Sequence, residues 1–126
     1  MAVDIRIIHP HAIVQVTPSG EFDLETSKRA MTEVVAFGEG QTDYDVILDT
    51  RLAKSLLSMT DLWHLAAHYA TLPQASHRRI AIIVPPERLE HAHFLALCGE
   101  NNGFDTRGFA EIGEALKWLV GPEARG

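Results

Sequence analysis

The chain has 126 residues and a mass of 13.9 kDa, which suits one compact domain with a single hydrophobic core. Apolar residues make up 46% and charged residues 22%, so the composition predicts a folded globular protein and excludes an intrinsically disordered one. The net charge of −6 opposes binding to nucleic acid or to an anionic membrane surface.

The cysteine content and the length of the apolar runs indicate the cellular compartment of the protein. The single Cys98 excludes an internal disulfide and a multi-cysteine zinc site, and its leucine neighbours predict a small buried side chain. The opening residues MAVDIRIIHP contain no secretory signal or lipidation motif. No apolar run reaches the roughly 18 residues that a membrane-spanning helix needs. We therefore expect a cytoplasmic protein without membrane insertion.

The beginning of the chain predicts a β-hairpin. Aliphatic residues at every second position from Val3 to Ile7 indicate a half-buried strand that ends before Pro10. Residues 12–17 predict a second strand, antiparallel to the first because the connection between them is short. Pro18-Ser19-Gly20 is predicted to end it.

Helical and strand patterns alternate after this hairpin. A helix is predicted over 23–37, with Asp23 capping its first turn and Gly38 and Gly40 near its end. Short apolar runs that end near Asp49 and Val84 are typical of strands covered on both faces. The remaining predictions are helices over 60–71, 87–101 and 112–120, and a weak strand over 106–109 interrupted by Gly108.

This order predicts an α/β fold. Strands that alternate with helices form right-handed crossovers and hence a mainly parallel sheet. We expect about five strands and about four helices, with the N-terminal antiparallel hairpin at one end of the sheet. Residues 1–122 are expected to form a single domain, followed by a frayed tail over 123–126.

Three stretches of the sequence resemble STAS domains, the domains of sulfate transporters and anti-sigma-factor antagonists. Residues 20–26, G-E-F-D-L-E-T, resemble the family's G-E-L-D-x-x-T motif. Asp49 and Ser58 lie where the family has D-L-S followed by D-S-S-G, and residues 114–119, E-A-L-K-W-L, resemble its E-A-L-x-W-L ending. The resemblance covers nearly the whole chain and implies a divergent SpoIIAA-like domain of the anti-sigma-factor-antagonist type.

The segment around Ser58 departs from the family motif. The family's D-S-S-G is here Leu57-Ser58-Met59-Thr60, so one serine remains without its acidic neighbour, the second serine or the glycine. Phosphorylation would add about −1.5 to −2 charges at a helix N-terminus, which is how a switch would work. The alternative is that Ser58 caps the helix together with Asp61.

The first functional hypothesis is a non-enzymatic regulatory module that binds a protein partner. The resemblance implies this role, and the contact surface is placed between Asp49 and Tyr69. Arg51, Lys54 and Arg88 are predicted beyond the carboxyl ends of strands, where they either favour an anion or are solvated loop cations. The predicted surface comprises Asp49, Arg51, Lys54, Ser58, Asp61, Trp63 and His64.

The second hypothesis is a carrier of a small apolar ligand or lipid. The SpoIIAA-like branch resembles Sec14-type lipid-binding folds, which implies an apolar pocket between a helix and the sheet. Alanines near Trp63 also favour a groove at this helix, unless these residues belong to the core margin. Self-association through the free edge of the hairpin is a further hypothesis.

No catalytic, metal or cofactor motif is assembled. His64 and His68 lie four residues apart with Asp61 on the same side, but the glutamate of H-E-x-x-H is missing and solvated histidines are expected there. His91 and His93 point to different sides of their helix. There is no G-x-S-x-G elbow and no Walker loop, so no cofactor, metal or enzymatic activity is predicted.

Overall fold

The computed structural model describes residues 2–8, 13–38, 44–72 and 78–120. They form one six-stranded sheet in the order β1-β2-β3-β5-β6, and β4 pairs with β2 off this path. Only β1 and β2 are antiparallel; the other pairs are parallel. The strands are β1 (Ala2–Ile8), β2 (Ile13–Phe22), β3 (Asp45–Asp49), β4 (Ala53–Ser55), β5 (Arg79–Ile83) and β6 (Asp105–Phe109).

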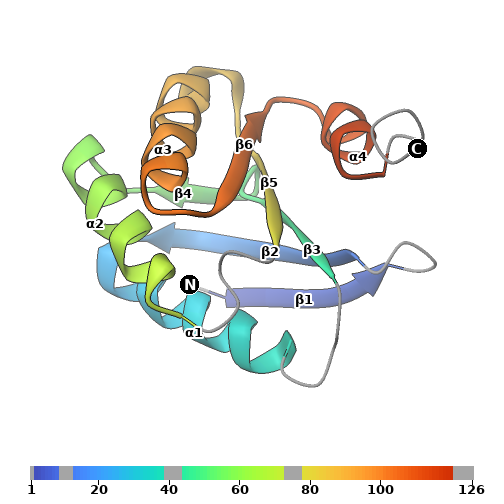
Figure 1. The fold of residues 1–126 in the computed structure, drawn as a ribbon, viewed down its shortest axis with the longest axis horizontal. Helices are drawn as coiled ribbons and strands as arrows, with labels where there is room; N and C mark the ends of the chain where they lie inside the picture. The colour runs from blue at the N-terminus through green and yellow to red at the C-terminus, as the bar shows by residue number, and fades with distance from the viewer. Residues whose placement is uncertain (1, 9–12, 39–43, 73–77, 121–126) are drawn as a thin grey trace.

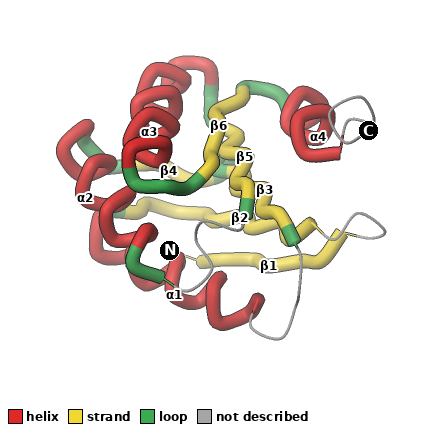
Figure 2. Tube along the Cα trace, in the orientation of Figure 1, coloured by secondary structure: helices red, strands yellow, loops and turns green. Residues whose placement is uncertain are grey.

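Four α-helices cover the two faces of the sheet unequally. Helices α1, α2 and α3 lie on one face, and α4 lies alone on the other (Figures 1 and 2). The predicted α/β fold, with a parallel sheet and an N-terminal hairpin, is therefore confirmed. The helices are α1 (Leu24–Gly38), α2 (Met59–Ala70), α3 (Leu89–Asn101) and α4 (Ile112–Val120), with the short 3-10 helix η2 (Pro86–Arg88) before α3.

Each face of the sheet has its own hydrophobic core, and successive residues of a strand contribute to opposite faces. Ile13, Ile47 and Ile83 are fully buried and pack against Ala115 and Leu119 of α4. Their neighbours in the strands point to the other face, because side chains alternate along a strand. That second set, buried under α1, α2 and α3, includes Val14, Val16, Val46, Ile80 and Ile82.

Strand β2 is longer than the sequence predicts. Pro18-Ser19-Gly20 does not end it, because β2 changes its parallel partner there: residues 13–16 pair with β3 and residues 20–22 pair with β4. Pro18 lies between these two ladders, where its missing N–H breaks neither of them. Gly20 has a φ of 81°, a left-handed conformation that glycine adopts without steric cost.

Several sequence expectations lie outside the described residues. These are the 9–12 connection of the hairpin, Gly40 after the first helix, Pro73 after the second, and the tail over 123–126. In the part of the chain that the structure describes, no helix has both the length and the apolar character needed to cross a membrane.

The weak strand predicted near Gly108 is present as β6, and the glycine has a packing role. A Cβ added at Gly108 would lie 2.5 Å from the Cβ of Ala92 on α3. Atoms that close must move apart, so the absence of a side chain allows α3 to pack directly on β6. The residue that weakens the strand signal therefore sets the distance between helix and sheet.

We predict that Gly108→Ala destabilises the protein by about 1–3 kcal/mol, because the added methyl overpacks the contact with α3. Gly113→Ala is the matched control: its added Cβ meets nothing within 4 Å, and alanine favours a helix over glycine by up to about 1 kcal/mol. Urea denaturation measures both variants. Equal unfolding free energies for the two variants would contradict this account.

Candidate functional site

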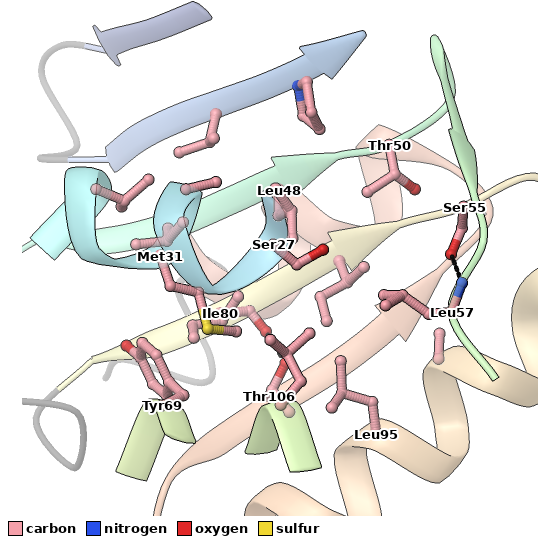
Figure 3. A pocket seen from close by; sticks show the side chains of 18 of the residues that line it. Ser27, Met31, Leu48, Thr50, Ser55, Leu57, Tyr69, Ile80, Leu95 and Thr106 are labelled. Atoms are coloured by element: carbon pink, nitrogen blue, oxygen red, sulfur yellow. Dashed lines mark hydrogen bonds between the residues drawn. The ribbon is translucent and has the colours of Figure 1, made fainter. Parts of the chain in front are cut away.

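The helices α1, α2 and α3 do not close completely on the sheet. A cavity of about 180 Å³ remains between them and the strands, as Figure 3 shows from close by. Its lining is overwhelmingly aliphatic and aromatic. The main contributors are Val16, Val46, Leu48, Ile80 and Ile82 from the sheet, and Met31, Val34, Leu62, Leu65 and Leu95 from the helices.

Small side chains at the helix positions leave this space open. Ala30 on α1, Ala66 on α2 and Ala92 on α3 all line the cavity, and Ala66 is fully buried. Protein interiors are normally packed with few voids larger than a water molecule. A cavity of about 150 Å³ with an apolar lining stays dry and binds benzene, so the volume here is large enough for a small organic molecule.

Polar side chains gather at one end of the cavity. Ser27 follows the end of β2, Thr50 follows β3, and Arg88 and His91 follow β5, so they lie near the carboxyl ends of parallel strands. The Thr50 hydroxyl already has a hydrogen-bond partner, because it donates to the carbonyl oxygen of Ile83 at 2.8 Å. This is the edge of an α/β sheet at which ligands bind.

Arg88 closes this polar end by holding the segment after β4. Its Nη2 donates to Ser55 Oγ at 2.9 Å and to the Leu57 carbonyl oxygen at 3.2 Å. Ser55 Oγ also accepts from the Leu57 amide at 3.2 Å, the bond drawn in Figure 3. The sequence places Arg88 beyond a strand end but gives no sign that it lines an apolar cavity.

The opposite end is closed by aromatic and cationic contacts. The Arg78 guanidinium lies 3.4 Å from the centre of the Tyr44 ring and donates to the Tyr44 carbonyl oxygen at 3.1 Å. Tyr69 packs edge-on against Phe104 with ring centres 4.8 Å apart. Burial raises the pKa of Tyr69 to about 12, so its hydroxyl is neutral at physiological pH.

Asp49, one residue of the predicted contact surface, is buried in the folded chain. It is only 7% exposed, and its carboxylate accepts from Arg51 Nε at 2.9 Å, Arg51 Nη2 at 2.8 Å and the Arg51 amide at 3.1 Å. These bonds from Arg51 hold the pKa of Asp49 below its usual value. Asp49 therefore fixes the turn after β3, and only Arg51 of this pair is exposed.

Ser58 forms the helix cap that the sequence predicts. Its Oγ accepts from the Asp61 amide at 3.1 Å, and Asp61 Oδ2 accepts from the Ser58 amide at 3.0 Å, which is a complete capping box. A phosphate on Ser58 would lie beside the Asp61 carboxylate, and like charges repel. Phosphorylation of Ser58 remains a hypothesis.

The other predicted surface residues lie around the start of α2. Lys54 is exposed, with its Nζ 4.0 Å from Glu21, and His64 packs edge-on against exposed Trp63 with ring centres 5.1 Å apart. Among the described residues, no group of three or more His, Cys, Asp or Glu side chains is placed to hold a metal ion. Leu52 and Leu56, which are 73% and 51% exposed, lie in the same segment and were not singled out from the sequence.

Comparison with known proteins identifies the fold. No family model and no curated protein sequence matches the chain. Several solved structures match it, and two of them show the likeness. An uncharacterised DUF3478-family protein with a SpoIIAA-like fold from Shewanella loihica PV-4 has a TM-score of 0.61 at 15% identity, covering 94% of this chain and 93% of its own. The chain has the SpoIIAA-like fold.

A second structure supports the same STAS-type architecture. An anti-sigma factor antagonist from Mycobacterium paratuberculosis has a TM-score of 0.52 at 21% identity and covers 94% of both chains. The likeness spans nearly the whole chain. The fold implied by the G-E-F-D-L-E-T and E-A-L-K-W-L stretches is therefore correct, and the low identity fits the divergence of the D-S-S-G segment.

We predict that part of the protein's acid sensitivity comes from Asp49. Its pKa in the folded state lies below the ordinary value of 3.8, so its stabilising contribution is complete above that value and is lost as the pH falls through the lower, folded-state pKa. Asp49→Asn removes this titration. Urea unfolding from about pH 6 to about pH 3 should therefore show the stability advantage of the native protein over Asp49→Asn shrinking below about pH 4. An advantage that stays constant over this range would rule out the Asp49–Arg51 pair as its source.

Proposed function

We propose that this SpoIIAA-like domain is a non-catalytic regulatory module that binds a small apolar ligand between its three-helix layer and its sheet. The observation that carries the proposal is the cavity of about 180 Å³. The fold alone favours a regulatory role, because one of the similar structures is an anti-sigma factor antagonist. The cavity adds a site through which such a role can respond to a ligand.

The free energy of packing favours an occupant. Apolar side chains without packing partners lose dispersion contacts, which is a cost, and the cavity of about 180 Å³ has a largely aliphatic lining. An apolar ligand recovers part of this cost through contacts with Leu48, Leu62 and Leu95, whereas water gains little in an apolar space. Ligand binding would therefore also stabilise the fold.

The chemistry of the lining supports binding and offers little for catalysis. Among the described residues that line the cavity there is no carboxylate and no thiol. Ser27 and His91 both line it, but Ser27 Oγ and His91 Nδ1 have no hydrogen-bond partner. A nucleophile of this kind needs an adjacent base that is itself oriented by a third group, and this arrangement is not assembled here.

We predict that 1-octanol raises the Tm of the protein by several degrees, since a ligand that binds only the folded state stabilises it. Ala30→Phe fills the cavity from α1 and should abolish the shift. Ala67→Phe adds the same ring at an exposed position of α2 and should leave the shift intact. Calorimetry of the three proteins measures the effect. The proposal fails if 1-octanol shifts none of them, or shifts the native protein and Ala30→Phe equally.

A protein contact at the start of α2 is the second candidate function. The exposed side chains Leu52, Leu56 and Trp63, the last 56% exposed, lie in the segment that the sequence assigns to the contact surface. Clustered exposed apolar residues with a charged rim are typical of a docking site. Arg51 and Lys54 supply such charges beside them.

We predict that Trp63→Glu abolishes capture of a stoichiometric partner from native lysate, because a buried charge at an interface centre is costly. Leu97→Glu is the control, since Leu97 is a similarly exposed apolar residue (60%) on a different helix, α3. Affinity capture with quantitative mass spectrometry compares the variants. Equal recovery with Trp63→Glu and Leu97→Glu, or no stoichiometric partner for the native protein, would exclude this surface as the contact.

A further inference from the structure

Two polar atoms at the strand-end side of the cavity are buried without a partner. They are the Oγ of Ser27, on the first turn of α1, and the Nδ1 of His91, on the first turn of α3. Ser27 is only 9% exposed, and Figure 3 shows its hydroxyl directed towards the interior, on the side of Thr50 and Leu57. Unpaired buried polar groups are costly, so a ligand with a polar head group at this end would gain hydrogen bonds to these atoms.

Arg88 supplies a positive charge at the same end. Both of its described hydrogen bonds use Nη2, and a guanidinium has further donors on Nε and Nη1. Within the described ranges, no carboxylate lies within ion-pair distance of Arg88. A half-buried guanidinium without an anion favours a ligand that brings one.

The start of α3 adds little positive charge to that of Arg88. The 3-10 helix η2 leads directly into α3, and the amides of Arg88 and Leu89 donate to the carbonyl oxygens of Pro85 and Pro86. The charge at this end of the cavity is therefore that of one guanidinium, which matches a ligand with a single negative charge. The other cavity cation, Arg78, is stacked on Tyr44 at the far end.

We propose that the ligand is a medium-chain monocarboxylate, with its carboxylate at Arg88 and Ser27 and its alkyl chain along Leu48, Leu62 and Leu95. This inference rests on the proposed function and adds the head group to it. An alkyl chain of roughly six to eight carbons suits the volume, since a cavity of about 150 Å³ accommodates benzene. The observation that carries the inference is the placement of Ser27 and Arg88, both with unused donors, at one end of an apolar cavity.

The test compares ligands of one length and different head groups. Titration calorimetry on the whole chain uses octanoate, 1-octanol and octylamine as probes. We expect octanoate to bind at least about tenfold more tightly than 1-octanol, since a hydrogen bond to a charged group contributes more than a neutral one, and octylamine to bind most weakly. If 1-octanol binds as tightly as octanoate, the inference is overturned while the proposed function stands. If neither binds, both are overturned.

Variants then locate the head group. Arg88→Gln should weaken octanoate about tenfold more than it weakens 1-octanol, whereas Arg107→Gln, which removes the same charge from an exposed position beside Trp118, should change neither. Equal weakening of octanoate by Arg88→Gln and Arg107→Gln would overturn the assignment to Arg88. Should Arg88→Gln fail to fold, Ser27→Ala decides: a several-fold loss for octanoate alone supports the inference, and no loss overturns it.

Discussion

The parallel strands at the centre of this protein must be covered on both faces, and the rest of the structure depends on how that is done. Side chains alternate along β2, β3 and β5, so each strand sends one set of aliphatic residues to each helical layer. On one side the single helix α4 packs closely, with Ala115 fully buried and Leu119 1% exposed. The other face of the sheet is covered by the three helices α1, α2 and α3, and the cavity lies between them and the strands.

The cavity lies where ligands commonly bind in α/β proteins. Its polar end coincides with the carboxyl ends of the parallel strands, where loops and helix N-termini converge. The turn after β3 is held by the bonds from Arg51 to Asp49, and the segment after β4 is held by Arg88. These contacts give the cavity a defined wall. The same segment continues into the exposed start of α2, so a ligand inside and a partner outside would share one structural element.

The sequence predicts those features that arise from local patterning. Period-two alternation gives the hairpin, apolar runs give β3 and β5, and the spacing of Ser58 and Asp61 gives the capping box of α2. It misses β4, which has only three residues and no apolar alternation. It also ends β2 too early at Pro18, because the change of partner strand that makes this proline tolerable is a property of the assembled sheet.

The cavity and its polar end depend on tertiary contacts that no local pattern encodes. Ser27 is one polar residue on an amphipathic helix, and only its proximity to the sheet makes its burial evident. Arg88 is recognisable as a loop cation, but its bonds to Ser55 and Leu57 join residues more than thirty positions apart in the chain. The contact surface near the start of α2 stays a prediction, and the burial of Asp49, one of its predicted residues, is likewise a property of the folded chain.

The central claim is that the three-helix layer leaves a largely apolar, ligand-sized space. Diffraction from crystals pressurised with xenon tests it most directly, because xenon enters apolar cavities of this size without needing a particular chemistry. The account predicts xenon between the helices and the sheet, in contact with Leu48, Leu62 and Leu95. Side chains that close this space, with no xenon under α1, α2 and α3, would contradict it.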